Sequence, residues 1–361
     1  MSWDSAIRSK LQGKKIFVTG HNGFKGSWLV SWLACYDCEI VGYSLGLPAK
    51  SLYADAGLSS IVNREYIGDI RDFDHVKRSL IEVQPDLILH LAAQSLVRLS
   101  YREPLETWST NVQGTATVLQ AARLCPSVKA VLVVTSDKCY ENMEWAWGYR
   151  ESDRLGGYDP YSASKAATEL VVSSFKKSFY DNGGPSIASA RAGNVIGGGD
   201  WSEDRLVPDA VRAIQENGEL LIRSPHATRP WQHVLDCLQG YLLLATTLLD
   251  SPSSLAGTSA YNFGPDSTGN LEVADFLERM GRDIPELKWS AVDDLEDTSE
   301  PHEAGFLYLD SSLSRRTLGW SPRWNVDEAI SATADWYMRF MDRSESANDL
   351  MKRQLKEYLS E

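Results

Sequence analysis

Short apolar runs alternate with stretches of helical periodicity through the first half of the chain. The apolar and β-branched run "KKIFVTG", residues 14–20, ends at a glycine and predicts a buried strand. Apolar residues at helical spacing follow in "FKGSWLVSWLAC", and "EIVGYSL", residues 39–45, predicts a second strand. Further strands are predicted at 64–68, in "DLILHLAA" (86–93) and in "KAVLVVTS" (129–136), with helices around 72–83 and 108–124. Because strands alternate with helices, we expect right-handed βαβ crossovers and a parallel sheet.

The pattern loosens after residue 195 into segments rich in Gly, Pro and Trp, such as "GGGDW", "SPHATRPW" and "FGPDSTGN". Aromatic and Arg residues recur inside them, which is typical of loops that line a site. The prediction is an α/β fold: a Rossmann-type doubly wound parallel sheet with a smaller C-terminal α/β substrate lobe. We expect the first domain to span 1–195 and to regain 229–250, and the lobe with its terminal helices to span 196–361. A terminal helix pair is expected after about residue 330.

Composition and charge narrow the class of protein. The 361 residues carry a net charge of −13, which argues against a nucleic acid or an anionic membrane as partner. No apolar run reaches the roughly 20 residues that cross a bilayer, and the first residues lack the apolar stretch of a signal peptide, so a cytoplasmic enzyme is expected. Five cysteines suit a reducing compartment. Cys35 and Cys38 have CxxC spacing but no second pair, so we expect packing and no metal site.

Three glycines lie between the first strand and the first helix, in "TGHNGFKG". Gly20 permits a positive φ, Gly23 lets the backbone approach a pyrophosphate, and Gly26 lets helix and strand pack closely. A plain strand-to-helix turn would explain one glycine but not three. The GxxGxxG spacing resembles the extended short-chain dehydrogenase/reductase superfamily, whose members carry TGxxGFxG here. The resemblance places Phe24 and Lys25 beside the cofactor as well.

The same resemblance assigns roles to two later strand ends. In "GDIRD", Asp69 is expected to accept from the adenine amine, with Ile70 next to it. Leu91, Ala92 and Ala93 of "HLAAQ" are expected beneath the ribose and diphosphate. The second strand ends in "GYSL", with neither an acid for a ribose 2′-hydroxyl nor an Arg directly after it for a 2′-phosphate. The resemblance favours NAD over NADP, and the residues alone do not decide.

A tyrosine and a lysine are four residues apart in "GGYDPYSASKAATEL". Asp159 can cap this helix, so Tyr161 and Lys165 share one face near its start. The nearby positive charge of Lys165 stabilises the phenolate and lowers the pKa of Tyr161, which can then act as a base toward a sugar hydroxyl. YxxxK alone is a weak signal. Ser136, at the end of an intervening strand, completes the Ser, Tyr, Lys set of the superfamily, and Asn111 matches its fourth polar residue.

The stretch "TSDKCY" places Asp137 and Lys138 directly after this serine. They could simply pair with each other or with solvent at a strand end. An extra acid and base beside a newly made ketone also permit β-elimination, in which C5 loses a proton and C6 its hydroxyl. An ordinary lysine has a pKa of about 10.4, so Lys138 is a base only if that pKa is depressed. Otherwise it stabilises the enolate and another residue takes the proton.

Long stretches resemble the CDP-glucose 4,6-dehydratases, among them "GHNGFKGSWL", "SDKCYEN", "RAGNVIGGGDW" and "ATRPWQHV". Related dTDP- and GDP-sugar dehydratases carry Asp-Glu where this chain carries Asp-Lys. The resemblance implies conversion of CDP-D-glucose to CDP-4-keto-6-deoxy-D-glucose with NAD, in deoxysugar or O-antigen biosynthesis. It assigns Asp137 as the acid toward the C6 hydroxyl. It also implies a homodimer held by a four-helix bundle.

An acidic protein that binds a nucleoside diphosphate needs local cations. We expect substrate contacts from polar and aromatic residues in the nonregular segments of the second half, and from two residues of "AAQSLVR". These residues are Arg191, Asn194, Arg205, Arg223, Arg229, Trp231, Ser95 and Arg98. For any single Arg, a surface ion pair is the alternative.

Two other functions fit part of the pattern. A nucleotide-sugar 4-epimerase would use the same scaffold but would not need Asp137 and Lys138. A redox-sensing or scaffold protein could bind a dinucleotide without turnover, although Ser136, Tyr161 and Lys165 argue against it.

Overall fold

Seven parallel strands form the central sheet of the computed structural model, which describes residues 3–250, 255, 258–292 and 305–360. The strand order is β10-β6-β5-β4-β1-β2-β3, which confirms the predicted doubly wound parallel sheet. The strands are β1 (Lys15–Thr19), β2 (Glu39–Ser44), β3 (Arg64–Ile67), β4 (Leu87–His90), β5 (Ala130–Val134), β6 (Ser186–Ala192) and β10 (Ala260–Phe263).

Alternate residues of each strand point to opposite faces of this sheet, and helices bury both faces. Ile16 and Val18 of β1 belong to the core beneath α2 (Phe24–Ala34) and α10 (Val234–Asp250). Phe17, between them, belongs to a second core. That core contains residues of α4 (Phe73–Val83), α7 (Gly114–Arg123) and α8 (Pro160–Phe175). Burial on both faces explains why the strands read as continuous apolar runs.

The sheet has a switch point between β1 and β4, whose last residues Thr19 and His90 are paired in register. From β1 the chain builds outward through β2 and β3, whereas β4 continues to β5 and β6 on the other side. The loops that follow β1 and β4 therefore leave in opposite directions and open a crevice at their carboxyl ends. Gly20 and Leu91 are the first residues of these two loops.

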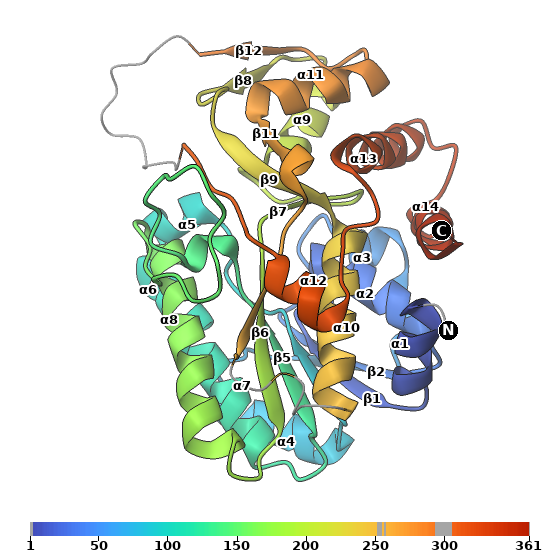
Figure 1. Ribbon diagram of the computed structural model, residues 1–361. Coiled ribbons are helices and arrows are strands. Elements are labelled where there is room, and N and C mark those ends of the chain that lie inside the picture. Colours follow the sequence, from blue (N-terminus) through green and yellow to red (C-terminus); the bar gives the residue numbers. More distant parts are fainter. Residues whose placement is uncertain (1–2, 251–254, 256–257, 293–304, 361) are drawn as a thin grey trace.

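A smaller lobe covers the carboxyl edge of the sheet (Figure 1). It contains a three-stranded sheet of order β11-β9-β7 and a parallel pair, β8 and β12. The bounds are β7 (Asn194–Ile196), β8 (Leu220–Ile222), β9 (Thr228–His233), β11 (Asn270–Glu272), β12 (Trp289–Ala291), α9 (Leu206–Gln215) and α11 (Val273–Asp283).

The chain crosses between the two parts several times. Helix α10 returns to the main sheet and packs against β5 and β6. β10 also returns and pairs with β6, Ala260 opposite Ser189, although the expected boundaries left this strand in the lobe. β9, expected to return with α10, instead pairs with β7 and β11. The expected terminal helix pair is confirmed as α13 (Val326–Met341) and α14 (Ala347–Ser360).

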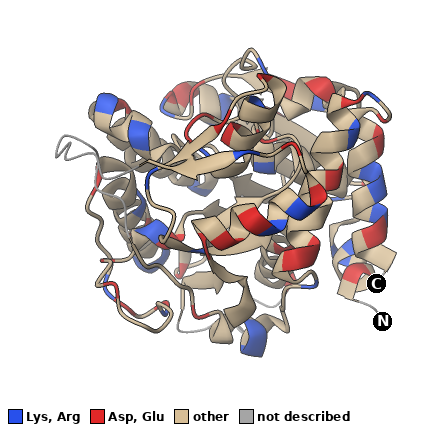
Figure 2. Ribbon diagram, turned by 90° about the horizontal axis from the view of Figure 1, so that it is seen from above, with Lys and Arg blue, Asp and Glu red and all other residues tan. Residues whose placement is uncertain are grey.

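The other α- and π-helical segments of the described residues are short. They are α1 (Trp3–Leu11), α3 (Leu52–Asp55), α5 (Val97–Arg102), α6 (Pro104–Trp108), the π-helical turn Ser109–Gln113 that joins α6 to α7, its counterpart Lys176–Tyr180 after α8, and α12 (Ser312–Leu318). Within the described ranges, no helix combines the length and hydropathy needed to span a membrane. Lys and Arg residues lie among Asp and Glu residues over the face seen from above (Figure 2).

Candidate active site

A cavity of ≈ 1190 Å³ lies over the carboxyl ends of the central strands and extends beneath the smaller lobe. All residues that are expected to contact the cofactor or the substrate line it, except Arg191. Of the proposed catalytic residues, only Asn111 does not. The lining residues include Gly20, Gly23, Phe24, Lys25, Gly26, Asp69, Ile70, Leu91, Ala92, Ala93, Ser95, Arg98, Ser136, Asp137, Lys138, Tyr161, Lys165, Asn194, Arg205, Arg223, Arg229 and Trp231.

The glycine loop is shaped to admit a ligand against its backbone. Gly20 has a φ of +71°, and a Cβ there would lie 2.8 Å from the amide nitrogen of Ala92. A Cβ on Gly26 would overlap the carbonyl oxygen of Gly20. Gly23, the N-cap of α2, is less crowded, since an added Cβ would lie 3.4 Å from the carbonyl oxygen of Gly20. The loop therefore fits the diphosphate of a dinucleotide, which would meet the positive end of α2.

The expected adenine contact, Asp69, is held in place by a neighbour. Arg71 donates from Nε to both carboxylate oxygens at 3.0 Å and from its backbone amide to Oδ1 at 2.8 Å. Arg71 also bonds Glu106 and Ser109, at 2.6 Å and 2.9 Å. Its hydrogen bonds hold the pKa of Asp69 below its usual range. Arg71 also lines the cavity. Sequence analysis does not predict this residue, and its place beside Asp69 in "GDIRD" is the one signal that could have identified it.

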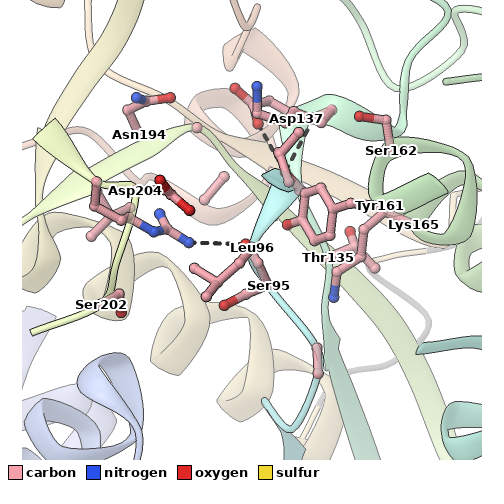
Figure 3. Close-up of a pocket in the computed structure, with 18 of the residues that line it drawn as sticks. Ser95, Leu96, Thr135, Asp137, Tyr161, Ser162, Lys165, Asn194, Ser202 and Asp204 are labelled. Carbon is pink, nitrogen blue, oxygen red and sulfur yellow. Dashed lines mark hydrogen bonds between the residues drawn. The ribbon is translucent and has the colours of Figure 1, made fainter. Parts of the chain in front are cut away.

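Tyr161 and Lys165 project from the first turns of α8 into the cavity (Figure 3). Asp159 caps this helix by accepting from the amide of Ser162 at 2.9 Å. Burial raises the pKa of Tyr161 to about 12, opposed by a hydrogen bond with Ser136 and by the charge of Arg205. This direction corrects the expected lowering of that pKa, because burial outweighs the interactions that favour the phenolate. Burial also lowers the pKa of Lys165 to about 8, and the charge of Lys25 contributes.

Ser136 and Asp137 follow β5 and form a buried pair. The hydroxyl of Ser136 donates to Oδ1 of Asp137 at 2.9 Å, while Oδ2 is buried and has no hydrogen-bond partner among the described residues. Burial raises the pKa of this carboxyl group, opposed by the charge of Lys138 and the Ser136 hydrogen bond. Gly193 leaves room for it, since an added Cβ would lie 3.1 Å from Oδ2. This environment shifts the carboxyl group toward its protonated form, which is the direction that a general acid requires.

Two polar residues lie away from the positions expected for them. Asn111 is behind the cavity wall, where it donates to Ser164 Oγ and the carbonyl of Gln94, both at 2.9 Å. It holds the loop after β4 against α8 and is therefore a positioning residue. Arg191 points into the protein, where its Nη2 lies 2.8 Å from Glu169 Oε2. Arg191 does not line the cavity, which corrects its expected substrate contact, because strand β6 turns its side chain toward buried Glu169.

Contacts between the two lobes cross the cavity at its outer side. Arg205 donates to the carbonyl of Ser95 at 3.1 Å, and Arg98 lies 3.8 Å from Asp204. Asn194 and Asp204 lie across the cavity from Tyr161 and Lys165 (Figure 3). Trp231 borders the cavity but is 4% exposed, and its indole donates to the carbonyl of Leu271.

The sequence matches the family model described as "GDP-mannose 4,6 dehydratase" over residues 17–333. The chain belongs to this family. It is 44% identical over 359 residues to "CDP-glucose 4,6-dehydratase" of Salmonella typhimurium, with 97% of each chain covered. It is 28% identical to "dTDP-D-glucose 4,6-dehydratase" of Mus musculus, covering 90% of this chain and 89% of the other.

Solved structures show the same fold at lower identity. The epimerase Mth375 of Methanothermobacter thermautotrophicus superposes with a TM-score of 0.79 at 22% identity, covering 94% of this chain and 96% of the other. A dTDP-glucose 4,6-dehydratase of Bacillus anthracis, solved in complex with NAD, gives 0.75 at 20% identity, with 91% and 98% covered. Both dehydratases and epimerases thus share this family member's architecture, so the distinction between them depends on its site residues.

Proposed function

We propose that this chain catalyses the NAD-dependent 4,6-dehydration of CDP-D-glucose to CDP-4-keto-6-deoxy-D-glucose. The observation that carries the proposal is the buried carboxyl group of Asp137, which accepts from Ser136 at Oδ1 while its Oδ2 has no hydrogen-bond partner in the described part of the chain. Oxidation at C4 alone requires only Ser136, Tyr161 and Lys165. Loss of water also requires an acid that protonates the leaving C6 hydroxyl, and the buried carboxyl group of Asp137 can supply that proton. The 44% identity to an enzyme named CDP-glucose 4,6-dehydratase supports the choice of sugar nucleotide.

NAD is the proposed cofactor. Gly20, Gly23 and the N-terminus of α2 fit its diphosphate, and Asp69 is oriented to accept from its adenine amine. At the end of β2 the cavity is lined by neutral Ser44 and Leu45. When bound, NAD accepts a hydride from C4 of the sugar and later returns it to C6.

The residues of this chain supply the proton transfers. Tyr161 takes the proton of the C4 hydroxyl, and Ser136 donates a hydrogen bond to the same oxygen. Positively charged Lys165 stabilises the phenolate form of Tyr161. The resulting ketone acidifies the C5 proton, and Asp137 protonates the C6 hydroxyl so that it leaves as water. Lys138 borders the same space, where it either takes the C5 proton or stabilises the enolate.

Arginines of both lobes are proposed to hold the diphosphate and nucleoside of the substrate. Arg98 approaches the cavity from the larger domain, and Arg205, Arg223 and Arg229 approach from the smaller lobe. Asn194 is proposed to contact the diphosphate from β7. Local cations of this kind offset the repulsion between a dianionic ligand and a protein of charge −13.

A 4-epimerase is the alternative because epimerases have the same fold. Asp137 decides between the two reactions. An epimerase has no leaving hydroxyl to protonate, so a buried and unpaired acid would serve no step. A protein that binds the dinucleotide without turnover would likewise have no use for the buried Ser136, Asp137 and Tyr161 group.

We also propose a homodimer. Helices α6 and α8 pack together and expose large apolar side chains, with Leu105 83% and Leu170 61% exposed. Two such helices from each of two chains would bury these side chains in a four-helix bundle. Light scattering should give the dimer mass for the native chain and a lower mass for Leu170→Lys. The cytoplasmic location and the role in deoxysugar biosynthesis stay predictions.

The proposed function is tested by incubation with NAD and one of four glucose donors linked to CDP, UDP, GDP or dTDP. We expect formation of the 4-keto-6-deoxy product from CDP-glucose at a rate well above the others. Turnover of a different nucleotide sugar would contradict the substrate but keep the reaction class. Interconversion of C4 stereoisomers without water loss would contradict the dehydratase proposal.

A further inference from the structure

Asp137 and Lys138 lie in one short turn after β5, beside Ser136. Ser136 caps the 3₁₀ turn Asp137–Cys139 by accepting from the amide of Lys138 at 3.2 Å. The amide of Tyr140 donates to the carbonyl of Asp137 at 3.3 Å and closes this 136–139 turn. Because a single turn has few contacts of its own, the directions of the Ser136 and Asp137 side chains depend on the residues that hold its two ends.

The first end of the 136–139 turn is held from α8 and β6. Thr135, which directly precedes Ser136, donates its hydroxyl to Glu169 Oε1 at 2.5 Å. The backbone amide of Thr135 donates to the carbonyl of Ala190 in β6 at 2.8 Å. Glu169 lies one helical turn after Lys165, so the helix that carries Lys165 also fixes the residue from which Ser136 follows.

The second end of the turn is held from β6 and β10. The hydroxyl of Tyr140 accepts from Arg191 Nη1 at 2.8 Å and donates to Asn262 Oδ1 at 2.7 Å. The guanidinium of Arg191 also lies over the Tyr140 ring, 4.9 Å from its centroid. Asn262 is fixed in turn, because its Nδ2 donates to the carbonyls of Tyr149 and Asp310 at 2.8 Å and 3.1 Å. Tyr140 is 1% exposed, so these contacts are shielded from water.

The two anchors meet in a buried ion pair, in which Arg191 Nη2 lies 2.8 Å from Glu169 Oε2. We propose, on the basis of the dehydration proposed above, that four residues clamp the 136–139 turn at both ends. These residues, the clamp, are Thr135, Glu169, Arg191 and Tyr140. They are positioning residues, which orient Ser136 toward the C4 oxygen and Asp137 toward the C6 hydroxyl.

An ion pair suits this role better than apolar packing would. A buried pair adds little net stability over apolar residues of the same volume, because both charges lose their water. Its charge-assisted hydrogen bonds are nevertheless strong and directional. Glu169 accepts from Thr135, and Arg191 donates to Tyr140, so each neighbour of the turn is held in one place. The pair therefore contributes the orientation of the turn more than stability.

The clamp is tested with Tyr140→Phe, which keeps the ring and removes only the hydroxyl group. In a single turnover with NAD and CDP-glucose, reduced cofactor should form at close to the native rate, because Thr135 still fixes Ser136. Elimination should slow by ~10-fold, a part of what a positioned acid contributes, so reduced cofactor should persist longer than in the native enzyme. Tyr180→Phe is the matched control. It removes a buried hydroxyl that donates to the carbonyl of Leu119 at 2.7 Å, away from the cavity, and should leave both rates unchanged.

A second variant separates the clamp from stability. Arg191→Met combined with Glu169→Leu replaces the ion pair with apolar side chains, so the free energy of unfolding should recover relative to Arg191→Met alone. Elimination should nevertheless stay ~10-fold slower than in the native enzyme, because neither new side chain can hydrogen-bond Thr135 or Tyr140. Recovery of the elimination rate together with stability would overturn the clamp.

Two results with Tyr140→Phe would also overturn the clamp. One is a native rate of elimination, and the other is equal slowing of oxidation and elimination, which would indicate a general structural role. Absence of dehydration by the native enzyme would instead overturn the proposed function, and with it the role of the clamp in elimination. The native chain alone therefore distinguishes that failure from the others.

Discussion

Arg191 and Glu169 form a buried ion pair, with Arg191 Nη2 2.8 Å from Glu169 Oε2 and both side chains at most 4% exposed. Glu169 lies one helical turn after Lys165 on α8, and it also accepts from Ser189 Oγ at 2.7 Å. Arg191 donates to the hydroxyl of Tyr140 at 2.8 Å. The pair thus joins α8 to β6 directly below the proposed catalytic residues, and its two charges cancel there.

Loss of one partner should be costly because it leaves a buried charge without its counterion. We expect Arg191→Met to lower the free energy of unfolding by about 3–5 kcal/mol, measured by urea denaturation. Replacing both residues, as Arg191→Met with Glu169→Leu, should restore much of this loss. Lys10→Met, which breaks the exposed pair with Asp250, serves as the control and should cost about 0–1 kcal/mol. Equal effects of the buried and exposed single variants would contradict the account.

Gly193 is predicted to be required for the position of Asp137. A Cβ there would lie 2.6 Å from Pro230 Cγ and 3.1 Å from Asp137 Oδ2, so Gly193→Ala should displace the carboxyl group. The dehydration rate should fall by ~10²-fold, as expected when a general acid is misplaced. Gly281→Ala in α11 is the matched control, since its Cβ would meet nothing within 4 Å. Full activity of Gly193→Ala would show that Asp137 does not need the space that Gly193 leaves beside its carboxyl group.

Lys25 should set the alkaline limit of activity through Lys165. Burial lowers the pKa of Lys165 to about 8, and the nearby charge of Lys25 lowers it further than burial alone. Above that pKa, Lys165 loses the charge that stabilises the Tyr161 phenolate, so kcat should decline. Lys25→Met removes a neighbouring cation, raises the pKa of Lys165 and should move the decline to higher pH at saturating NAD. Lys25→Arg should leave it in place. If the decline in kcat of Lys25→Met began at lower pH than in the native enzyme, this coupling would be contradicted.

Short sequence patterns are sufficient to predict much of the fold and of the candidate site. The glycine spacing and the Tyr161 to Lys165 spacing are properties of one turn or one helix, so a short stretch of sequence contains them. β10 was missed because its place in the sheet depends on pairing with β6, which is far away in the chain. Sequence alone predicts a substrate contact for Arg191 because its short segment also contains Asn194. Only the packing of β6 against α8 shows that its guanidinium points to Glu169.

The central claim is that Asp137 expels the C6 hydroxyl as water after oxidation at C4. The most direct measurement is a single turnover of Asp137→Asn with CDP-glucose, followed by the near-ultraviolet absorbance of reduced cofactor and by mass analysis of the sugar. We predict that reduced cofactor and the 4-keto sugar accumulate together, with the C6 hydroxyl retained. Formation of the 6-deoxy product at the native rate would contradict the account.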